Sequence, residues 1–374
     1  MPDRELHIII SGGGTGGHIF PAIAIADAIK KQVPNAQILF VGATGKMEME
    51  KVPAAGYQIE GIPVRGLQRK LTLSNLIFPF RLLVSLVEAR NILRHFKPDV
   101  AVGVGGYASG PLLRMAVSAK IPAIIQEQNS YPGITNRLLA KRVKKICVAY
   151  NGMEKYFPIE KIVVCGNPVR NDILNLNGKK QEAAGFFNLD ANRKTLLITG
   201  GSLGARTINE SVAKHIDLFI QNGLQVIWQC GKSYYPLASV MIPTIENKGI
   251  RIMEFISRMD LAYAMADIVI SRAGAIALAE LCIAGKPVIL IPSPNVTEDH
   301  QTHNAMALAG NDAAILLKDV EANEKLGAMV IDLIADAEKT RSLSENIRKM
   351  AFSDAAGKIA DEVIALAKQS KTKN

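Results

Sequence analysis

The sequence predicts an α/β protein made of two doubly wound domains, and three observations lead to this prediction. An apolar run meets a glycine-rich turn and a helix twice, as LHIIISGGGTGGH at 6–18 and as TLLITGGSLGAR at 195–206. Short Val, Ile and Leu runs alternate with amphipathic segments in both halves, which is typical of a parallel sheet covered by helices on both faces. Finally, a chain of 374 residues is too long for one ordinary domain, and its 48% hydrophobic residues are enough to build two cores.

Each half is expected to contribute six strands. The predicted strands are 6–10, 38–41, 100–104, 123–126, 146–149 and 162–165 in the first half, and 196–199, 226–229, 250–255, 268–271, 288–291 and 314–317 in the second. We place the boundary at GNPVR, 166–170, where Gly, Asn and Pro interrupt the periodicity. An amphipathic helix is expected at 355–367.

The net charge of +10 lies almost entirely in the first domain. Residues 1–170 carry 22 Lys and Arg against 11 Asp and Glu, a net charge of +11, whereas residues 171–374 carry 22 against 23, a net charge of −1. The sequence shows no helix-turn-helix signal, zinc-ligand spacing or aromatic stacking strip, so we expect no nucleic-acid partner. An anionic membrane surface or a polyanionic substrate fits the charge better.

The segment after Arg65 predicts where such a membrane would be met. Asn75, Arg81 and Glu88 interrupt its apolar run, which is therefore too short to span a bilayer. We interpret 82–93 as a helix face packed on the core. We interpret 73–80 as a patch that rests on the membrane. The predicted patch comprises Leu73, Leu76, Ile77 and Phe80, with the cations Arg69, Lys70 and Arg81 beside it.

The compartment is predicted from two further features. The first apolar run meets glycine at once, so no secretory signal is expected. The four cysteines, Cys147, Cys165, Cys230 and Cys282, lie in or beside predicted core elements at no metal-ligand spacing. We therefore expect them to be buried thiols in a reducing, cytoplasmic compartment, with no metal.

The first glycine loop contains Gly12, Gly14 and Gly17 at GxGxxG spacing, which alone is a weak dinucleotide signal. The second strand ends without the carboxylate that would hold an adenosine ribose, and no GxxxxGK[ST] motif is present, so NAD and P-loop nucleotides are disfavoured. His18 stands where the helix starts. It is a candidate general base for a hydroxyl nucleophile; the alternative is a histidine that merely caps or packs.

Five further polar stretches follow predicted strand ends, where doubly wound folds bind ligands. GVGGYASGP at 103–111 is suited to a diphosphate, or else forms only a tight turn. QEQNSYPGITNR at 126–137 offers Glu127 and Asn129 to a sugar. Ser202 in the second glycine loop is placed to hold a phosphate. Glu280, inside a glycine-opened helix, could accept both ribose hydroxyls, unless it is a solvated helix acid.

The last stretch is EDHQTHNA at 298–305. His300 and His303 within it suggest a metal, but no further ligand set accompanies them in the sequence. Hydrogen bonding to a sugar is therefore the preferred interpretation of this stretch.

These motifs, taken in order, resemble the MurG family of peptidoglycan glycosyltransferases. The resemblance runs from about Leu6 to beyond Asn304 and rests on the glycine loops, EQNSYPGITN, GNPVR, SRAGA with Glu280, and EDHQTHNA. It implies a GT-B fold, with two Rossmann-like domains facing across a cleft. Residues 1–169, with a C-terminal helix at about 352–374 that crosses back, would form the acceptor and membrane-facing domain. Residues 170–351 would bind the UDP-sugar.

The resemblance also implies the reaction and its setting. It implies inverting, metal-independent transfer of N-acetylglucosamine from UDP-N-acetylglucosamine to the muramyl 4-hydroxyl of lipid I, with no cofactor. The protein would attach peripherally to the cytoplasmic face of the bacterial inner membrane, with proteins of cell-wall synthesis and division as possible partners. The alternatives are a UDP-sugar transferase with another lipid acceptor, such as diacylglycerol, a UDP-N-acetylglucosamine epimerase, and a non-enzymatic membrane scaffold.

The site residues follow from the same resemblance, position by position. The catalytic candidates are His18 as the base and Glu127 as the runner-up. The donor set comprises Arg170 and Ser202 at the diphosphate, Ile256 at the uracil through its backbone, Glu280 at the ribose, Asn129 and Gln301 at the sugar, and Thr15 and Gly16 from the loop that faces the acceptor. The acceptor diphosphate is assigned to Gly14, Gly17, Gly103, Gly105, Gly106 and Tyr107. Leu203 and the single Gln301 depart from some relatives, which leaves individual sugar contacts open.

Overall fold

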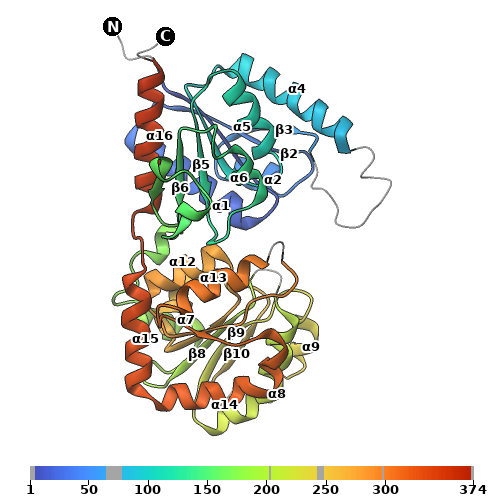
Figure 1. Cartoon of the computed structure of the whole chain (residues 1–374). Helices are drawn as coiled ribbons and strands as arrows, with labels where there is room; N and C mark the ends of the chain where they lie inside the picture. Colours follow the sequence, from blue (N-terminus) through green and yellow to red (C-terminus); the bar gives the residue numbers. More distant parts are fainter. Residues whose placement is uncertain (1–4, 65–77, 202–203, 242–247, 297–298, 372–374) are drawn as a thin grey trace. The chain divides into compact units, whose positions relative to one another are not determined.

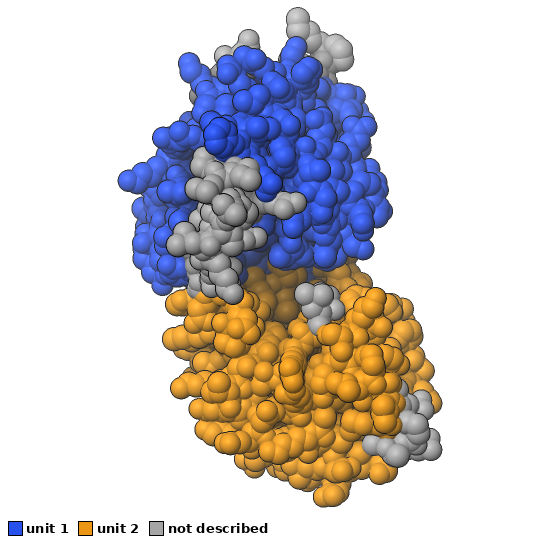
Figure 2. Space-filling view, turned by 90° about the vertical axis from the view of Figure 1, so that its right-hand side faces the viewer, with its two compact units in different colours: residues 1–169, 354–374 blue, residues 170–353 orange. Residues whose placement is uncertain are grey.

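The computed structural model describes residues 5–64, 78–201, 204–241, 248–296 and 299–371. The chain forms two compact units, coloured separately in Figure 2. Unit 1 comprises Met1–Val169 and Asp354–Asn374, and unit 2 comprises Arg170–Ser353.

Unit 1 is built on a seven-stranded parallel sheet in the order β3-β2-β1-β4-β5-β6-β7. Its strands are β1 (His7–Gly12), β2 (Gln37–Ala43), β3 (Gln58–Ile62), β4 (Val100–Gly105), β5 (Ala123–Glu127), β6 (Lys145–Val148) and β7 (Ile162–Val164). Its helices are α1 (Gly16–Gln32), α2 (Glu48–Ala54), α4 (Phe78–Phe96), α5 (Ser109–Ser118), α6 (Ile134–Leu139) and α16 (Ala355–Lys371), with 3-10 turns at Met153–Lys155 and Ile159–Lys161.

The alternation of side chains along β1 shows how both faces of this sheet are buried. Ile8 and Ile10 point into a core shared with α1 and α16, whereas Ile9 points into the core on the opposite face, where α4 and α5 lie. The C-terminal helix therefore helps to build the core of unit 1. Its outer edge is tied down as well, because Asp361 accepts a hydrogen bond from Gln32 of α1 at 2.9 Å.

Unit 2 repeats the architecture with a six-stranded parallel sheet in the order β10-β9-β8-β11-β12-β13. Its strands are β8 (Thr195–Thr199), β9 (Gln225–Gln229), β10 (Ile250–Met253), β11 (Ile268–Ser271), β12 (Val288–Leu290) and β13 (Ile315–Leu316). Its helices are α7 (Lys180–Phe187), α8 (Arg206–Gln221), α9 (Tyr235–Ser239), α11 (Met259–Met265), α12 (Ala275–Ala284), α13 (His300–Ala309), α14 (Ala322–Ala335) and α15 (Ala337–Lys349), with 3-10 turns at Asn171–Ile173 and Asp319–Glu321.

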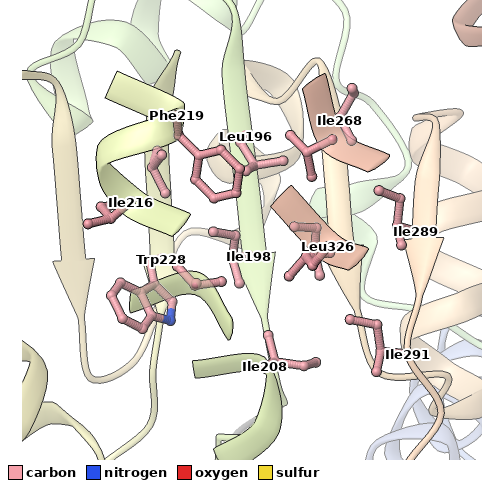
Figure 3. Packing of buried hydrophobic residues seen from close by; sticks show 14 of the residues in the cluster. Leu196, Ile198, Ile208, Ile216, Phe219, Trp228, Ile268, Ile289, Ile291 and Leu326 are labelled. Carbon is pink, nitrogen blue, oxygen red and sulfur yellow. The ribbon is translucent and has the colours of Figure 1, made fainter. Parts of the chain in front are cut away.

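The core of unit 2 lies between this sheet and helices α8 and α14. Figure 3 shows Phe219 of α8 beside Leu196 of β8, and Leu326 of α14 in the same cluster. Trp228 of β9 is fully buried, and its indole N–H donates to the side-chain oxygen of Asn209 at 2.9 Å. Burial of this N–H therefore leaves no donor unsatisfied.

The predicted α/β fold with two doubly wound parallel sheets is confirmed. All twelve predicted strands are present, although 250–255 ends two residues early at Met253. Strand β3 was not predicted. It is a short edge strand that contains Gly61, and its pattern of half-buried residues gives a weak signal. The predicted helix at 355–367 lies within α16.

Candidate active site

The two glycine loops of unit 1 meet at one point of its sheet. β1 pairs with β2 on one side and with β4 on the other, so the chain departs in opposite directions from this point, where doubly wound folds bind ligands. The N–H of Gly13 donates to the carbonyl of Gly105 at 3.3 Å. Gly106 has φ +86°, and a Cβ there would lie 2.2 Å from the Gly13 oxygen, so only glycine lets the loops approach this closely.

His18 lies in the first turn of α1 and faces the second loop. Its Nδ1 is 3.1 Å from the carbonyl oxygen of Gly13 and 3.2 Å from the hydroxyl of Thr15. A Cβ on Gly105 would come within 2.5 Å of the imidazole, which places the ring directly against that residue. Because a carbonyl only accepts, Nδ1 carries the proton of the neutral ring, and Nε2 is the basic nitrogen.

Glu48 is a residue of this site that the sequence interpretation missed. It opens α2, and its carboxylate accepts from Gly14 N–H at 2.9 Å and from Ala43 N–H at 3.0 Å. The side chain is only 1% exposed. Nothing in its local sequence distinguishes it from the neighbouring Glu50, because its partners are contributed by the loops after β1 and β2.

Glu127 stands at the end of β5 and organises the loop that follows. Its carboxylate accepts from the N–H and side-chain amide of Asn129, from Gly133 N–H and from the side-chain amide of Asn136. Burial raises the pKa of Glu127, and these hydrogen bonds oppose the rise. A carboxylate that accepts four hydrogen bonds is well suited to hold a loop. Its role as an alternative base stays a prediction.

A chain of buried amides continues from Glu127 to the end of unit 1. Gln126 donates to the side-chain oxygen of Asn167 at 3.0 Å, and Asn167 donates to the backbone carbonyl of Gln128 at 2.9 Å. Gln128 in turn donates to the carbonyl of Val104 at 2.6 Å. The GNPVR motif is thereby anchored to the strand ends that carry the candidate site.

The glycine loop of unit 2 follows its central strand β8. Gly204 has φ +77°, and a Cβ there would lie 2.2 Å from the carbonyl of Cys230, so the loop packs tightly against the end of β9. Gln229, which was not predicted, donates to the carbonyl of Gly201 at 3.0 Å and accepts from Ile256 N–H at 2.9 Å. The predicted phosphate ligand Ser202 lies outside the described residues.

Glu280 and Arg170, both predicted donor ligands, form an ion pair with each other. Glu280 lies in α12, and its carboxylate accepts from Arg170 at 3.3 Å and from the hydroxyl of Tyr263 at 3.2 Å. Burial raises the pKa of Glu280, and Arg170 and Tyr263 oppose the rise. The pKa of the Tyr263 hydroxyl is also raised, because it is buried beside this carboxylate. Tyr263 was not identified from the sequence.

The remaining predicted sugar ligand, Gln301, stands in the first turn of α13. Its side-chain oxygen accepts from Ser293 N–H at 2.9 Å and so fixes the segment after β12. Arg272 of the SRAGA motif fixes the same segment from the other side, donating to the carbonyls of Ile291 and Pro292 at 3.0 Å each. These contacts hold together the strand ends that carry the predicted donor residues.

Helix α4 has two apolar faces, of which the expectation for 82–93 covered only the packed one. Ala89, Ile92 and Leu93 pack into the core as predicted. The opposite face carries Phe80, Leu83, Val84 and Val87, which are between 48% and 71% exposed and lie three or four residues apart. We call these four residues the α4 stripe. Figure 1 shows α4 along the outside of unit 1, next to α5.

The other predicted patch residues, Arg69, Lys70, Leu73, Leu76 and Ile77, lie outside the described part of the chain, whereas Arg81 is half-buried near the start of α4. No helix among the described residues is both long and apolar enough to cross a membrane. All four cysteines are buried and free. Within the described ranges, no group of three or more His, Cys, Asp and Glu residues could hold a metal ion.

Two Rossmann-like units, each with a glycine loop after its central strand, form the architecture of the GT-B fold. The chain belongs to glycosyltransferase family 28. Residues 8–148 match the family's N-terminal domain, and residues 195–359 match its C-terminal domain.

Three similar proteins illustrate the relationship. The chain is 53% identical to a Flavobacterium psychrophilum protein over 99% of this chain and 100% of the relative. It is 54% identical to a Parabacteroides distasonis protein over 97% and 99%. Both relatives are named UDP-N-acetylglucosamine–N-acetylmuramyl-(pentapeptide) pyrophosphoryl-undecaprenol N-acetylglucosamine transferase. The crystal structure of Acinetobacter baumannii MurG matches with a TM-score of 0.78 and 27% identity, covering 96% of this chain and 99% of that one.

Proposed function

We propose that this chain transfers N-acetylglucosamine from UDP-N-acetylglucosamine to the muramyl 4-hydroxyl of lipid I and thereby makes lipid II. The observation that carries the proposal is the match, over almost the whole of both chains, to transferases named for this reaction. The two glycine loops, with His18 at the end of the first, support the same chemistry.

Unit 1 would supply the proton acceptor. His18 Nε2 takes the proton of the muramyl 4-hydroxyl as its oxygen attacks the anomeric carbon of the donor sugar. The bond from that carbon to the UDP oxygen breaks, and UDP leaves with the electron pair. A single displacement of this kind inverts the anomeric configuration. Gly13, which accepts from Nδ1, holds the ring in the tautomer that the reaction needs.

Unit 2 would hold the donor. Arg170 and the N–H groups at the start of α8 would stabilise the negative charge that develops on the departing diphosphate, so the proposed reaction needs no metal. Glu280 would receive the ribose hydroxyls, and Gln301 the sugar. Ile256 N–H already donates to Gln229, so a uracil would meet the backbone carbonyl of Ile256 or replace this contact.

The α4 stripe would rest on the lipid surface that carries the acceptor. Arg90 and Arg94 continue the exposed face of α4 beyond Val87 and would meet anionic headgroups. This assignment supports a peripheral protein at the cytoplasmic face of the bacterial inner membrane, where partners from cell-wall synthesis would also be found.

The deciding experiment measures transfer of radiolabel from UDP-N-acetylglucosamine to a lipid I analogue, with and without a chelator. Labelled lipid II in both samples is the expected result. Diacylglycerol, offered as a competing acceptor, should stay unlabelled, and no epimerised sugar should form when the acceptor is left out. Label in diacylglycerol, or epimerisation without acceptor, would move the chain to one of the alternative functions.

A further inference from the structure

Glu48 is an acid in an unusual position beneath the first glycine loop. Its carboxylate is buried, and in the described part of the chain no Lys, Arg or His forms an ion pair with it. Its two oxygens instead accept from two backbone N–H groups: Oε2 from Gly14 and Oε1 from Ala43. A buried carboxylate that is satisfied only by backbone amides fixes the position of those amides.

Two glycines make room for this side chain. A Cβ on Gly13 would lie 2.2 Å from Oε1 of Glu48, and a Cβ on Gly42 would lie 2.6 Å from its Cγ. Neither glycine has a positive φ, so conformational freedom does not explain their presence. Glu48 is therefore enclosed between the end of β2 and the glycine loop, and a shift of the carboxylate would shift the loop.

The loop passes this constraint on to His18. Gly13 N–H donates to Gly105, and Gly13 carbonyl oxygen accepts from His18 Nδ1 at 3.1 Å. Glu48 holds the next residue, Gly14, by its N–H. The Gly13 carbonyl and the Gly14 N–H belong to one peptide unit, so His18 and Glu48 contact opposite ends of the same unit, while β4 holds the N–H just before it.

We propose that Glu48 is the positioning residue of the acceptor loop: it fixes Gly13 and Gly14 so that His18 and the loop are correctly placed for the acceptor. This proposal rests on the proposed function, because it takes the loop to be the acceptor side. Glu48 itself contacts neither substrate and acts through the loop.

Charge and geometry predict opposite effects of replacing Glu48, and this makes the proposal testable. A carboxylate under a loop that receives a diphosphate repels that ligand. If charge dominated, Glu48→Gln would tighten acceptor binding. If geometry dominates, Glu48→Gln weakens acceptor binding. A glutamine amide has only one acceptor oxygen, so its NH2 group would face the N–H of either Gly14 or Ala43, donor against donor.

The experiment compares Glu48→Gln and Glu48→Asp with Glu50→Gln, which replaces an exposed acid of the same helix. We expect kcat/KM for a lipid I analogue to fall about 10-fold to 100-fold in both Glu48 variants, the scale of one buried N–H left unsatisfied. Glu48→Asp keeps the charge but loses the reach. The KM for UDP-N-acetylglucosamine should be unchanged in both Glu48 variants. The control variant Glu50→Gln should have the kinetic constants of the wild type. An unchanged or higher kcat/KM for the acceptor in Glu48→Gln would overturn the proposal, as would a loss of activity explained entirely by a smaller folded fraction.

Gly42→Ala provides a second, independent variant. It leaves the loop and its acid intact but pushes Glu48 from the β2 side, and it should reproduce the acceptor defect. Hydrogen exchange at Gly14 N–H is a measurement that does not depend on catalysis, and it should be faster in Glu48→Gln. An unchanged exchange rate would show that Glu48 does not hold the loop. If the wild-type protein makes no lipid II, the proposed function fails, and the exchange of Gly14 still decides whether Glu48 holds the loop.

Discussion

Unit 1 and unit 2 each have a glycine loop after the central strand, but different side-chain contacts support the two loops. In each, the central strand runs into a glycine loop and a helix, and a side chain from a neighbouring element supports the loop. In unit 1 the support is the carboxylate of Glu48, which accepts from a loop N–H. In unit 2 it is the amide of Gln229, which donates to a loop carbonyl.

The difference shows how one fold can present two kinds of chemistry. The Glu48 contact occupies an N–H of its loop and adds a negative charge, and the distinctive group that this loop offers is the imidazole of His18. The Gln229 contact occupies no loop N–H and adds no charge. The same unit also contains Arg170, which is paired with Glu280. Under the proposed function, unit 1 supplies the proton acceptor, and unit 2 holds the diphosphate that leaves.

Replacing His18 should produce the largest loss of activity. A small loss would contradict the assignment of the proton acceptor to unit 1. We expect His18→Ala to lower kcat by about 100-fold or more, the usual scale for loss of a general base. The affinity for UDP, measured by calorimetry, should stay the same, because unit 2 is untouched.

The matched control is His95→Ala, which removes an exposed histidine whose Nδ1 contacts its own helix at Asn91. Its kcat should equal that of the wild type with a short-chain, water-soluble acceptor. Near-normal turnover of a folded His18→Ala protein would remove His18 from the role of base and return Glu127 to consideration.

The sequence predicted the fold and the loops but not the side chains that support them. Apolar periodicity and glycine spacing are local signals, so the strands and both loops could be located. Glu48, Gln229 and Tyr263 could not, because each acts on a backbone or side-chain group that the fold brings from elsewhere in the chain. The second face of α4 was missed for another reason: Leu83 and Val87 have the same apolar character as the residues that pack, and only the tertiary structure decides which face is covered.

Glu280 should produce the next largest effect and sharpens the assignment of the donor to unit 2. Glu280→Gln should raise the KM for UDP-N-acetylglucosamine about 30-fold, the scale of a hydrogen bond to a charged group, with a smaller change in kcat. Initial rates at saturating acceptor measure this. The exposed Glu324→Gln in α14 is the control, and an unchanged donor KM in Glu280→Gln would separate this residue from the ribose.

The raised pKa of Glu280 adds a pH dependence with a defined sign. Because the pKa of Glu280 is raised above its ordinary value of 4.5, the carboxylate takes up its proton in weakly acidic buffer. The donor KM should therefore rise as the pH falls into that range. Stability follows the opposite direction. Because the folded state binds this proton more tightly than the unfolded state, the group makes unit 2 more stable as the pH falls through the folded pKa. Weaker donor binding in acid without a lower Tm would therefore identify titration rather than unfolding.

The smallest effect is expected for membrane binding, which we assign to unit 1 and not to unit 2. Leu83→Ser with Val87→Ser removes two members of the α4 stripe and should weaken binding to vesicles with anionic lipid about 5-fold to 10-fold, as expected for the loss of two partly inserted side chains. Sedimentation with the vesicles measures this, and activity on a water-soluble acceptor should persist.

The matched control replaces two apolar residues of unit 2 that are more exposed than Leu83 and Val87: Leu237→Ser with Val240→Ser, which are 68% and 77% exposed. Exposure alone does not make a membrane contact, because isolated apolar side chains are common on protein surfaces. The α4 stripe differs in that its four members form one continuous row on a helix that continues into Arg90 and Arg94. If the unit 2 pair weakened vesicle binding as much as the α4 pair, the membrane contact could not be assigned to unit 1. Binding that depends on the α4 pair alone, and declines as salt is added, would assign it there, since salt screens the arginines but not the apolar row.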